Sequence, residues 1–127
     1  MKQGAFVNKF RIQRVAVLGA GVMGAQIAGH LANAGIAVDL FDLPGPAEDR
    51  NQVVTAALAR LKKLEPSPLA SSAVLSLIRS NNFDDHLPRL AEAQLIIEAV
   101  AERMEIKRSL YAKIAPVCSA SAWIVSN

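Results

Sequence analysis

Between Arg14 and Asp42 the chain carries glycines at a spacing that few folds use. The segment reads RVAVLGAGVMGAQIAGHLANAGIAVDLFD. An apolar run leads into the glycine-rich stretch Gly19–Gly24, a helical pattern continues to Gly35, and a second apolar run ends at Asp42. This order of strand, glycine turn, helix, strand and acid, with the acid about 20 positions after the turn, predicts a βαβ unit that binds a dinucleotide.

Each residue of the predicted turn has a physical role. Gly19 permits the tight turn out of the strand, Gly21 leaves room for a pyrophosphate to approach the backbone, and Gly24 lets the helix pack closely on the strand. Val22 and Met23 complete the turn at the start of the helix. The unpaired N–H groups at the start of this helix and the positive end of the helix dipole favour an anion there.

Asp42 is expected at the end of the second strand, where its carboxylate would accept the hydroxyls of an adenosine ribose. The same negative charge would repel a 2′-phosphate, and the next residues, Leu43–Gly45, include no arginine to hold one. We therefore predict NAD rather than NADP as the cofactor. The alternative is a well-packed βαβ unit whose glycines serve only its turns.

Composition narrows the choice of partner and compartment. With 127 residues and 13.5 kDa the chain forms one domain. Its net charge of +3 is modest and only 5% of its residues are aromatic, so a phosphorylated small molecule fits better than nucleic acid. Cys118 is the sole cysteine, no metal-ligand cluster is visible, and no apolar run has the length of a signal peptide or membrane span. We expect a soluble, cytoplasmic protein without metal or membrane partner.

The remaining segments alternate between helical and strand patterns. Residues 1–12 are expected to form a polar lead-in, and residues 13–127 the domain itself. The expected elements, in chain order, are a helix that contains the apolar residues from Val53 to Leu64 with Asp49 or Asn51 as cap, a strand at 77–80, a turn at Asn81-Asn82 and a short helix through Leu87 and Leu90 capped by Asp84 or Asp85. They continue with a strand at 94–100, a helix with Met104, Ile106, Leu110 and Ile114 on one side that Pro116 ends, and a strand from Trp123.

This alternation predicts an α/β fold, a Rossmann-type doubly wound parallel sheet truncated after its fifth strand. Glu98 lies inside the apolar run QLIIEAV, which is typical of a strand covered on both faces. We interpret Glu98 as a structural carboxylate at the end of that strand, hydrogen-bonded to neighbouring backbone.

Three motifs together resemble a known family. VAVLGAGVMGAQIA, LFD, and LIIEAVAERMEIK with a later strand ending in Ser-Asn resemble the NAD-binding domain of the 3-hydroxyacyl-CoA dehydrogenases of fatty-acid β-oxidation. The resemblance covers residues 14–127. The insertion at 61–85 further resembles a bacterial branch in which a longer chain also carries an enoyl-CoA hydratase module.

The resemblance implies roles for several positions. Met23 would touch the cofactor, Val100, Ala101 and Glu102 would line the nicotinamide half of the site, and Lys107 would reach the cofactor from the following helix. Without the family, a solvated helix start with ordinary surface charges would be the preferred interpretation of Glu102 and Lys107.

The resemblance also implies the oxidation of 3-hydroxyacyl-CoA to 3-oxoacyl-CoA. In the family, a catalytic His–Glu pair lies beyond the region matched here, and neither His30 nor His86 corresponds to it. We therefore assign no catalytic residue to this chain, expect it to be inactive alone, and expect oligomers only with a C-terminal domain. Alternatives are another NAD-dependent hydroxyacid dehydrogenase and a non-catalytic module that senses NADH.

Overall fold

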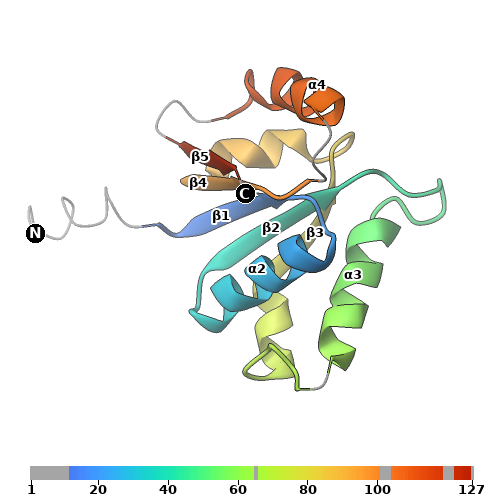
Figure 1. Ribbon diagram of the computed structural model, residues 1–127, viewed down its shortest axis with the longest axis vertical. Helices are drawn as coiled ribbons and strands as arrows, with labels where there is room; N and C mark the ends of the chain where they lie inside the picture. Colours follow the sequence, from blue (N-terminus) through green and yellow to red (C-terminus); the bar gives the residue numbers. More distant parts are fainter. Residues whose placement is uncertain (1–11, 65, 101–103, 119–121, 127) are drawn as a thin grey trace, which may run out of the picture.

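A computed structural model of the chain describes residues 12–64, 66–100, 104–118 and 122–126, with the backbone alone at 104–107. Its centre is a five-stranded, all-parallel sheet in the order β3-β2-β1-β4-β5 (Figure 1). The strands are β1 Arg14–Leu18, β2 Ala37–Asp42, β3 Ile78–Asn82, β4 Leu95–Glu98 and β5 Trp123–Ser126; the helices are α2 Val22–Asn33, α3 Gln52–Lys63 and α4 Met104–Ile114, and the 3₁₀ helices are η1 Ser72–Leu77 and η2 Leu87–Glu92.

The strand order reverses direction at β1. From β1 the chain passes to β2 and β3 on one side, and then returns to the other side of β1 to form β4 and β5. Helices α2 and α3 lie on one face of the sheet, whereas α4 lies on the other (Figure 1). This doubly wound topology confirms the predicted Rossmann-type fold. In such sheets ligands bind where the strand order reverses, here between β1 and β4.

β1 is the most completely buried strand. Its residues alternate between two apolar cores, with Val15 and Val17 in the core beneath α2 and α3, and Ala16 and Leu18 in the core beneath α4 and η2. All four side chains are fully buried. Coverage on both faces explains why this strand is a continuous apolar run rather than an alternating one.

The glycine turn between β1 and α2 is closely packed. Gly19 has a φ of +108°, a conformation that disfavours any residue with a Cβ. A Cβ at Gly24 would lie 1.7 Å from the carbonyl oxygen of Gly19, so only glycine lets α2 approach the turn this closely. By contrast, a Cβ at Gly21 would have nothing within 4 Å. The turn therefore needs Gly19 and Gly24 for folding, and the space beside Gly21 remains open.

Two predictions after β2 are wrong. Asn81 and Asn82 belong to β3 and pair with Phe41 and Asp42 of β2, so they continue the strand instead of forming a turn. Asp84 and Asp85 do not cap the following 3₁₀ helix, whose N-cap is His86. The physical reason for both differences is the fully buried side chain of Asn82, whose Oδ1 accepts the backbone N–H groups of Asp84 and Asp85.

Other predicted boundaries differ less. The strand expected at 94–100 is shorter and spans Leu95–Glu98. Asn51 is the N-cap of α3, as one of the two expected alternatives, but its side chain makes no capping hydrogen bond. Its amide instead donates to the carbonyl oxygen of Ser80 and its oxygen accepts from the amide of Asn82, which ties the start of α3 to β3.

A charged network that the sequence patterns do not indicate joins the middle of the sheet. Asp39 of β2 is completely buried. Its carboxylate accepts two hydrogen bonds from the guanidinium of Arg79 on β3, one of them 2.8 Å long, and lies 3.4 Å from Nη1 of Arg14 on β1. Arg79 also contacts Glu92 at 3.4 Å. Buried carboxylates require such partners because desolvation of an unpaired charge is costly.

We expect Gly24→Ala to destabilise the fold by about 3 kcal/mol or more, because its methyl group would overlap the backbone of Gly19. Gly21→Ala is the matched control, since the added methyl meets no atom of the protein, and it should cost less than about 1 kcal/mol. Urea unfolding followed by circular dichroism compares the two. Equal destabilisation by both substitutions would contradict this packing of the turn.

Candidate functional site

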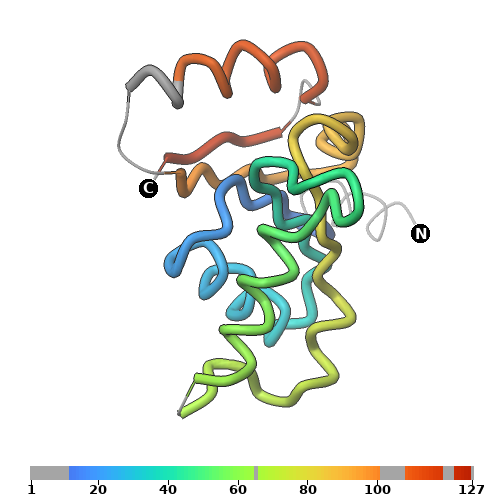
Figure 2. The backbone as a smooth tube through the Cα atoms, turned by 90° about the vertical axis from the view of Figure 1, so that its right-hand side faces the viewer, coloured from blue at the N-terminus to red at the C-terminus, as the bar shows by residue number. Residues whose placement is uncertain are grey.

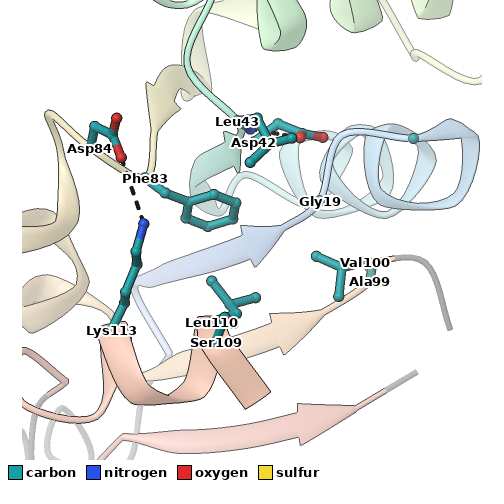
Figure 3. Close-up of a pocket in the computed structure, with 11 residues that line it drawn as sticks. Gly19, Asp42, Leu43, Phe83, Asp84, Ala99, Val100, Ser109, Leu110 and Lys113 are labelled. Atoms are coloured by element: carbon teal, nitrogen blue, oxygen red, sulfur yellow. Dashed lines mark hydrogen bonds and ion pairs between the residues drawn. The ribbon is translucent and has the colours of Figure 1, made fainter. Parts of the chain in front are cut away.

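A cleft of about 580 Å³ opens at the carboxyl ends of the strands, on the β1 and β4 side of the sheet where the strand order reverses (Figure 3). Its walls come from the glycine turn, the end of β2, the segments after β3 and β4, and α4. Its lining residues are Gly19, Gly21, Asp42, Leu43, Phe83, Asp84, Ala99, Val100, Ser109, Leu110 and Lys113. A concave, mostly apolar cleft with a few charged groups is typical of a cofactor site.

The start of α2 presents backbone donors at this cleft. Gly21, the N-cap residue, has extended backbone and no side chain to cap the helix, and the first turn contains no acidic residue. The first N–H groups of a helix have no intrahelical acceptor, and the helix dipole adds positive potential there. With the open space beside Gly21, this arrangement fits an anion such as a pyrophosphate.

Asp42 lies where β2 ends and joins the turn to the next loop. Its Oδ2 accepts the N–H of Ala20 at 2.7 Å, and its Oδ1 accepts the N–H of Leu43 at 2.6 Å. A carboxylate has about four acceptor positions, so each oxygen can still accept a hydroxyl group from a ligand. The two backbone bonds hold the carboxylate in place at the edge of the cleft.

The segment after β4 forms the wall opposite Asp42. The N–H of Ala99 donates to the carbonyl oxygen of Leu18 at 2.8 Å, which aligns the exit of β4 with that of β1. A Cβ on Gly19 would lie 2.9 Å from the Ala99 carbonyl and from the nitrogen of Val100. The Ala99–Val100 peptide is therefore in direct contact with the glycine turn, as the close-up shows (Figure 3).

Residues after β3 and on α4 close the other end of the cleft. The ring of Phe83 stacks on that of Phe41 with a centroid distance of 5.8 Å. The Lys113 ammonium of α4 lies 3.7 Å from the Asp84 carboxylate, an ion pair that spans the cleft (Figure 3). Arg50 also lies 3.7 Å from Asp84. Because these charged groups are half exposed, their pairing contributes little to stability and leaves them able to respond to a ligand.

Asn82 anchors this end from beneath. Its amide group donates to the Asn51 side chain at 2.9 Å and to the Asp85 carboxylate at 3.0 Å, while its backbone N–H donates to Nδ1 of His86 at 3.0 Å. The hydrogen bond from Arg50, followed by that from Asn82, lowers the pKa of Asp85. Burial, with a smaller effect from Arg89, lowers the pKa of His86.

The structure brings together some of the residues predicted for the site. Gly19, Gly21, Asp42 and Val100 line one cleft. Gly24 contacts the turn from within the fold and does not line the cleft. The remaining predicted residues are Val22 and Met23, which are exposed in the first turn of α2, Ala101 and Glu102, which fall outside the described residues, and Lys107, which lies in α4 with its side chain outside the described part.

Several lining residues were not predicted from the sequence. Phe83 and Asp84 directly follow β3. Their proximity to the site could have been predicted only if the end of that strand had been placed correctly at Asn82. Ser109 and Lys113 are four residues apart on α4 and so share one helix face with Leu110 nearby. The amphipathic pattern of α4 indicated its buried side but not which part of the sheet it covers.

Other reactive groups among the described residues lie away from the cleft. His30 is exposed in the last turn of α2, and Nδ1 of His86 is engaged by Asn82. Burial raises the pKa of the Cys118 thiol, which makes it a weak nucleophile.

Within 12–64, 66–100, 104–118 and 122–126, no group of acidic, histidine and cysteine side chains could hold a metal ion. Over the same ranges, no helix is both long and apolar enough to cross a membrane.

Glu98 occupies the position expected of it. It is the last residue of β4, completely buried, and its Oε1 accepts the N–H of Val100 at 2.8 Å. The interpretation of Glu98 as a carboxylate bound to neighbouring backbone is thus confirmed.

A glycine turn beneath an uncapped helix, an acid at the end of β2 and a cleft at the switch point define the NAD-binding Rossmann domain of a dehydrogenase. Residues 14–127 match the family described as "3-hydroxyacyl-CoA dehydrogenase, NAD binding domain". The chain therefore belongs to this family, as its motifs suggested.

Named relatives agree with this assignment. The chain is 39% identical, over 118 residues, to a Deinococcus radiodurans protein named as a probable 3-hydroxyacyl-CoA dehydrogenase, a match covering 92% of this chain and 34% of the relative. It is 37% identical to a Rickettsia felis protein named as a fatty acid oxidation complex trifunctional enzyme, covering 91% of this chain and 16% of that protein. The chain thus spans about a third or less of these relatives.

Solved structures show the same fold. The crystal structure of 3-hydroxybutyryl-CoA dehydrogenase from Escherichia coli K12 superposes with a TM-score of 0.69 at 33% identity, covering 93% of this chain and 25% of that one. The similarity extends to the sheet and both helical layers, since it includes nearly the whole chain.

The lowered pKa of His86 predicts a dependence of stability on pH. Folding favours the neutral imidazole, so its contribution to stability is present above the unfolded pKa of about 6.5 and is lost as pH falls through the lower folded pKa. Protonation would also remove the acceptor of the Asn82 N–H. We expect the melting temperature to fall between pH 7.5 and 5, and to fall less in His86→Ala. Parallel pH profiles for both proteins would contradict this role.

Proposed function

We propose that this chain is the cofactor-binding domain of an enzyme that oxidises 3-hydroxyacyl-CoA to 3-oxoacyl-CoA with NAD, in fatty-acid β-oxidation. The observation that carries the proposal is the placement of the Asp42 carboxylate and the uncapped start of α2 on one cleft. These two features recognise the adenosine ribose and the pyrophosphate, the parts common to every NAD molecule.

The described residues divide the cofactor between them. Asp42 accepts the ribose hydroxyls, and the N–H groups that follow Gly21 bind the pyrophosphate. Val100 and its neighbours after β4 line the nicotinamide half. The remaining predicted contacts, assigned from family resemblance, are Val22, Met23, Ala101, Glu102 and Lys107.

The proposed chemistry requires a general base in addition to the cofactor. When bound, NAD accepts a hydride from the carbon that bears the 3-hydroxyl, while a general base removes the hydroxyl proton. Neither His30 nor His86 lines the cleft, and we assign the base to another part of a longer enzyme, as the family resemblance implies. This domain binds the cofactor, orients it along the cleft and shields one side of it from water.

A coupled assay tests the activity. Absorbance of NADH should rise when a longer protein containing this domain is given NAD and 3-hydroxybutyryl-CoA, and it should not rise with the 127-residue chain alone. Turnover by the isolated chain would refute the assignment of the general base to another segment. Turnover of free 3-hydroxyacids in preference to their CoA thioesters would favour a different hydroxyacid dehydrogenase.

The names of the relatives support CoA thioesters as substrates and β-oxidation as the process. One is named for 3-hydroxyacyl-CoA, another for a fatty acid oxidation complex, and a solved structure for 3-hydroxybutyryl-CoA. Because all of these proteins are longer than this chain, the substrate is carried over as part of the proposal.

The setting of the enzyme is part of the same proposal. A single cysteine with no partner in the sequence suits a reducing compartment, and we place the protein in the cytoplasm.

Trp123 of β5 is 76% exposed and its neighbours Ile124 and Val125 are 43% exposed. Further residues of a protein as long as the relatives would cover this edge, and we expect oligomers to form only with that covering domain.

Calorimetric titration tests the cofactor. NADH should bind saturably and at least about tenfold (about 1.4 kcal/mol) more tightly than NADPH, because the 2′-phosphate would meet the Asp42 carboxylate. Asp42→Asn removes the charge with little change of shape, and it should narrow the difference between the two cofactors. Equal affinity of the wild-type chain for both would refute the role of Asp42.

Gly21→Ala and His30→Ala form a matched pair for the same titration. The methyl group at Gly21 projects into space that is open in the protein, so the variant should fold but bind NADH far more weakly. His30 lies at the opposite end of α2, where its removal should leave binding unchanged. Undiminished binding by Gly21→Ala would place the pyrophosphate elsewhere.

A further inference from the structure

Glu98 is a buried carboxylate whose position suggests more than a structural contribution to β4. Its side chain has no exposed surface, and it lies at the carboxyl end of the strand next to the switch point. Burial of a carboxylate is costly unless both oxygens accept hydrogen bonds. The groups that supply those bonds therefore show what Glu98 holds in place.

Glu98 connects two backbone segments at the rim of the sheet. One oxygen accepts the N–H of Val100 at 2.8 Å, in the segment that leads from β4 to α4. The other accepts the hydroxyl of Ser126 at 2.6 Å, at the end of the neighbouring strand β5. Glu98 and Ser126 are also paired in the sheet, so the side-chain bond adds to the ladder between β4 and β5.

The segment that Glu98 holds is a wall of the cleft. Ala99 and Val100 both line it, and their peptide lies within 2.9 Å of the position that a Cβ on Gly19 would occupy. The wall thus has no room to move toward the glycine turn, and the bond to Glu98 prevents movement away from it. The width of the cleft at this end depends on the Glu98 carboxylate.

The opposite end of the cleft is anchored independently. There, Asn82 and Asp42 hold the loops after β3 and β2 through their own hydrogen bonds. Those bonds lead to Ala20, Asn51 and Asp84, and none of them involves Glu98, Val100 or Ser126. A change at Glu98 should therefore affect one half of a bound dinucleotide and leave the other half in place.

We propose that Glu98 is the positioning residue for the nicotinamide half of the site, acting through the Val100 backbone and tied to β5 through Ser126. This inference rests on the proposed NAD function. In that function the adenosine lies at Asp42 and the pyrophosphate at the start of α2, which leaves the β4 end of the cleft for the nicotinamide.

Titration of the 127-residue chain with NADH and with ADP-ribose, which lacks the nicotinamide, separates the two halves. Glu98→Ala should weaken NADH at least about fivefold and change the affinity for ADP-ribose less than about twofold. Glu98→Gln should restore NADH binding, because its amide oxygen can accept from Val100 and its amide nitrogen can donate to Ser126. Circular dichroism confirms that each variant is folded.

Two further variants complete the comparison. Ser126→Ala removes the hydrogen bond between Glu98 and β5 at an exposed position, and it should reproduce a smaller share of the selective loss even if Glu98→Ala does not fold. Asn82→Ala, at the adenosine end, should weaken NADH and ADP-ribose alike.

The outcomes are distinct. Equal losses for NADH and ADP-ribose in Glu98→Ala and in Ser126→Ala, no loss for either ligand in those variants, or a Glu98→Gln variant as weak as Glu98→Ala, would each overturn the positioning role. The same follows if the wild-type chain binds NADH no more tightly than ADP-ribose. Failure of the wild-type chain to bind either ligand would instead refute the proposed function.

Discussion

The geometry of the site depends on the close backbone approach between α2 and the turn that precedes it. Gly24 lies so near the carbonyl of Gly19 that no side-chain carbon fits between them. This contact sets where α2 begins relative to the end of β1, and therefore where its unpaired N–H groups point. The remaining parts of the site, from Asp42 to the wall after β4, are positioned around that helix start.

The cleft is built from loops, yet buried polar side chains at strand ends hold it in shape. Asn82 at the end of β3 and Glu98 at the end of β4 each bind backbone N–H groups of the segment that follows. Both side chains are completely buried, so a ligand that enters the cleft displaces no water from them. A site held in this way is preorganised, and less binding free energy is spent on ordering loops. In the tube trace, the chain runs from the yellow segment that contains β3, through η2, to the orange segment that contains β4 (Figure 2).

Sequence alone predicted the β1–α2–β2 unit well because its signals are local. Glycine spacing, helical periodicity and the acid at Asp42 all fall within one stretch, and Gly35 ends the helix region with a φ of +83°. The end of β3 was misjudged because Ile78–Asn82 contains one apolar residue and ends in two asparagines. Its strand conformation depends on pairing with β2, a contact between residues about 40 positions apart. Local propensity carries no information on such contacts.

The site was predictable to the same extent. Gly19, Gly21 and Asp42 were found from one motif, and Val100 from a family resemblance. Phe83 was missed because the end of β3 was misplaced, and Lys113 was missed because it reaches the cleft only through the packing of α4 against the sheet. Ala101, Glu102 and Lys107 stay predictions, since the described residues or side chains do not include them.

The ion pair between Asp39 and Arg79 helps to select the correct pairing of β3 with β2 over pairings shifted by one residue. β3 has little apolar surface to distinguish correct pairing from a pairing shifted by one residue. A one-residue slip would turn Arg79 to the opposite face and leave the buried Asp39 without the guanidinium of Arg79. Replacement of such a pair by apolar residues often preserves stability, whereas loss of one partner alone is costly, so the pair disfavours the shifted register. The charged pair thus specifies the register of β3 against β2, whereas in β1 the buried apolar side chains specify the register.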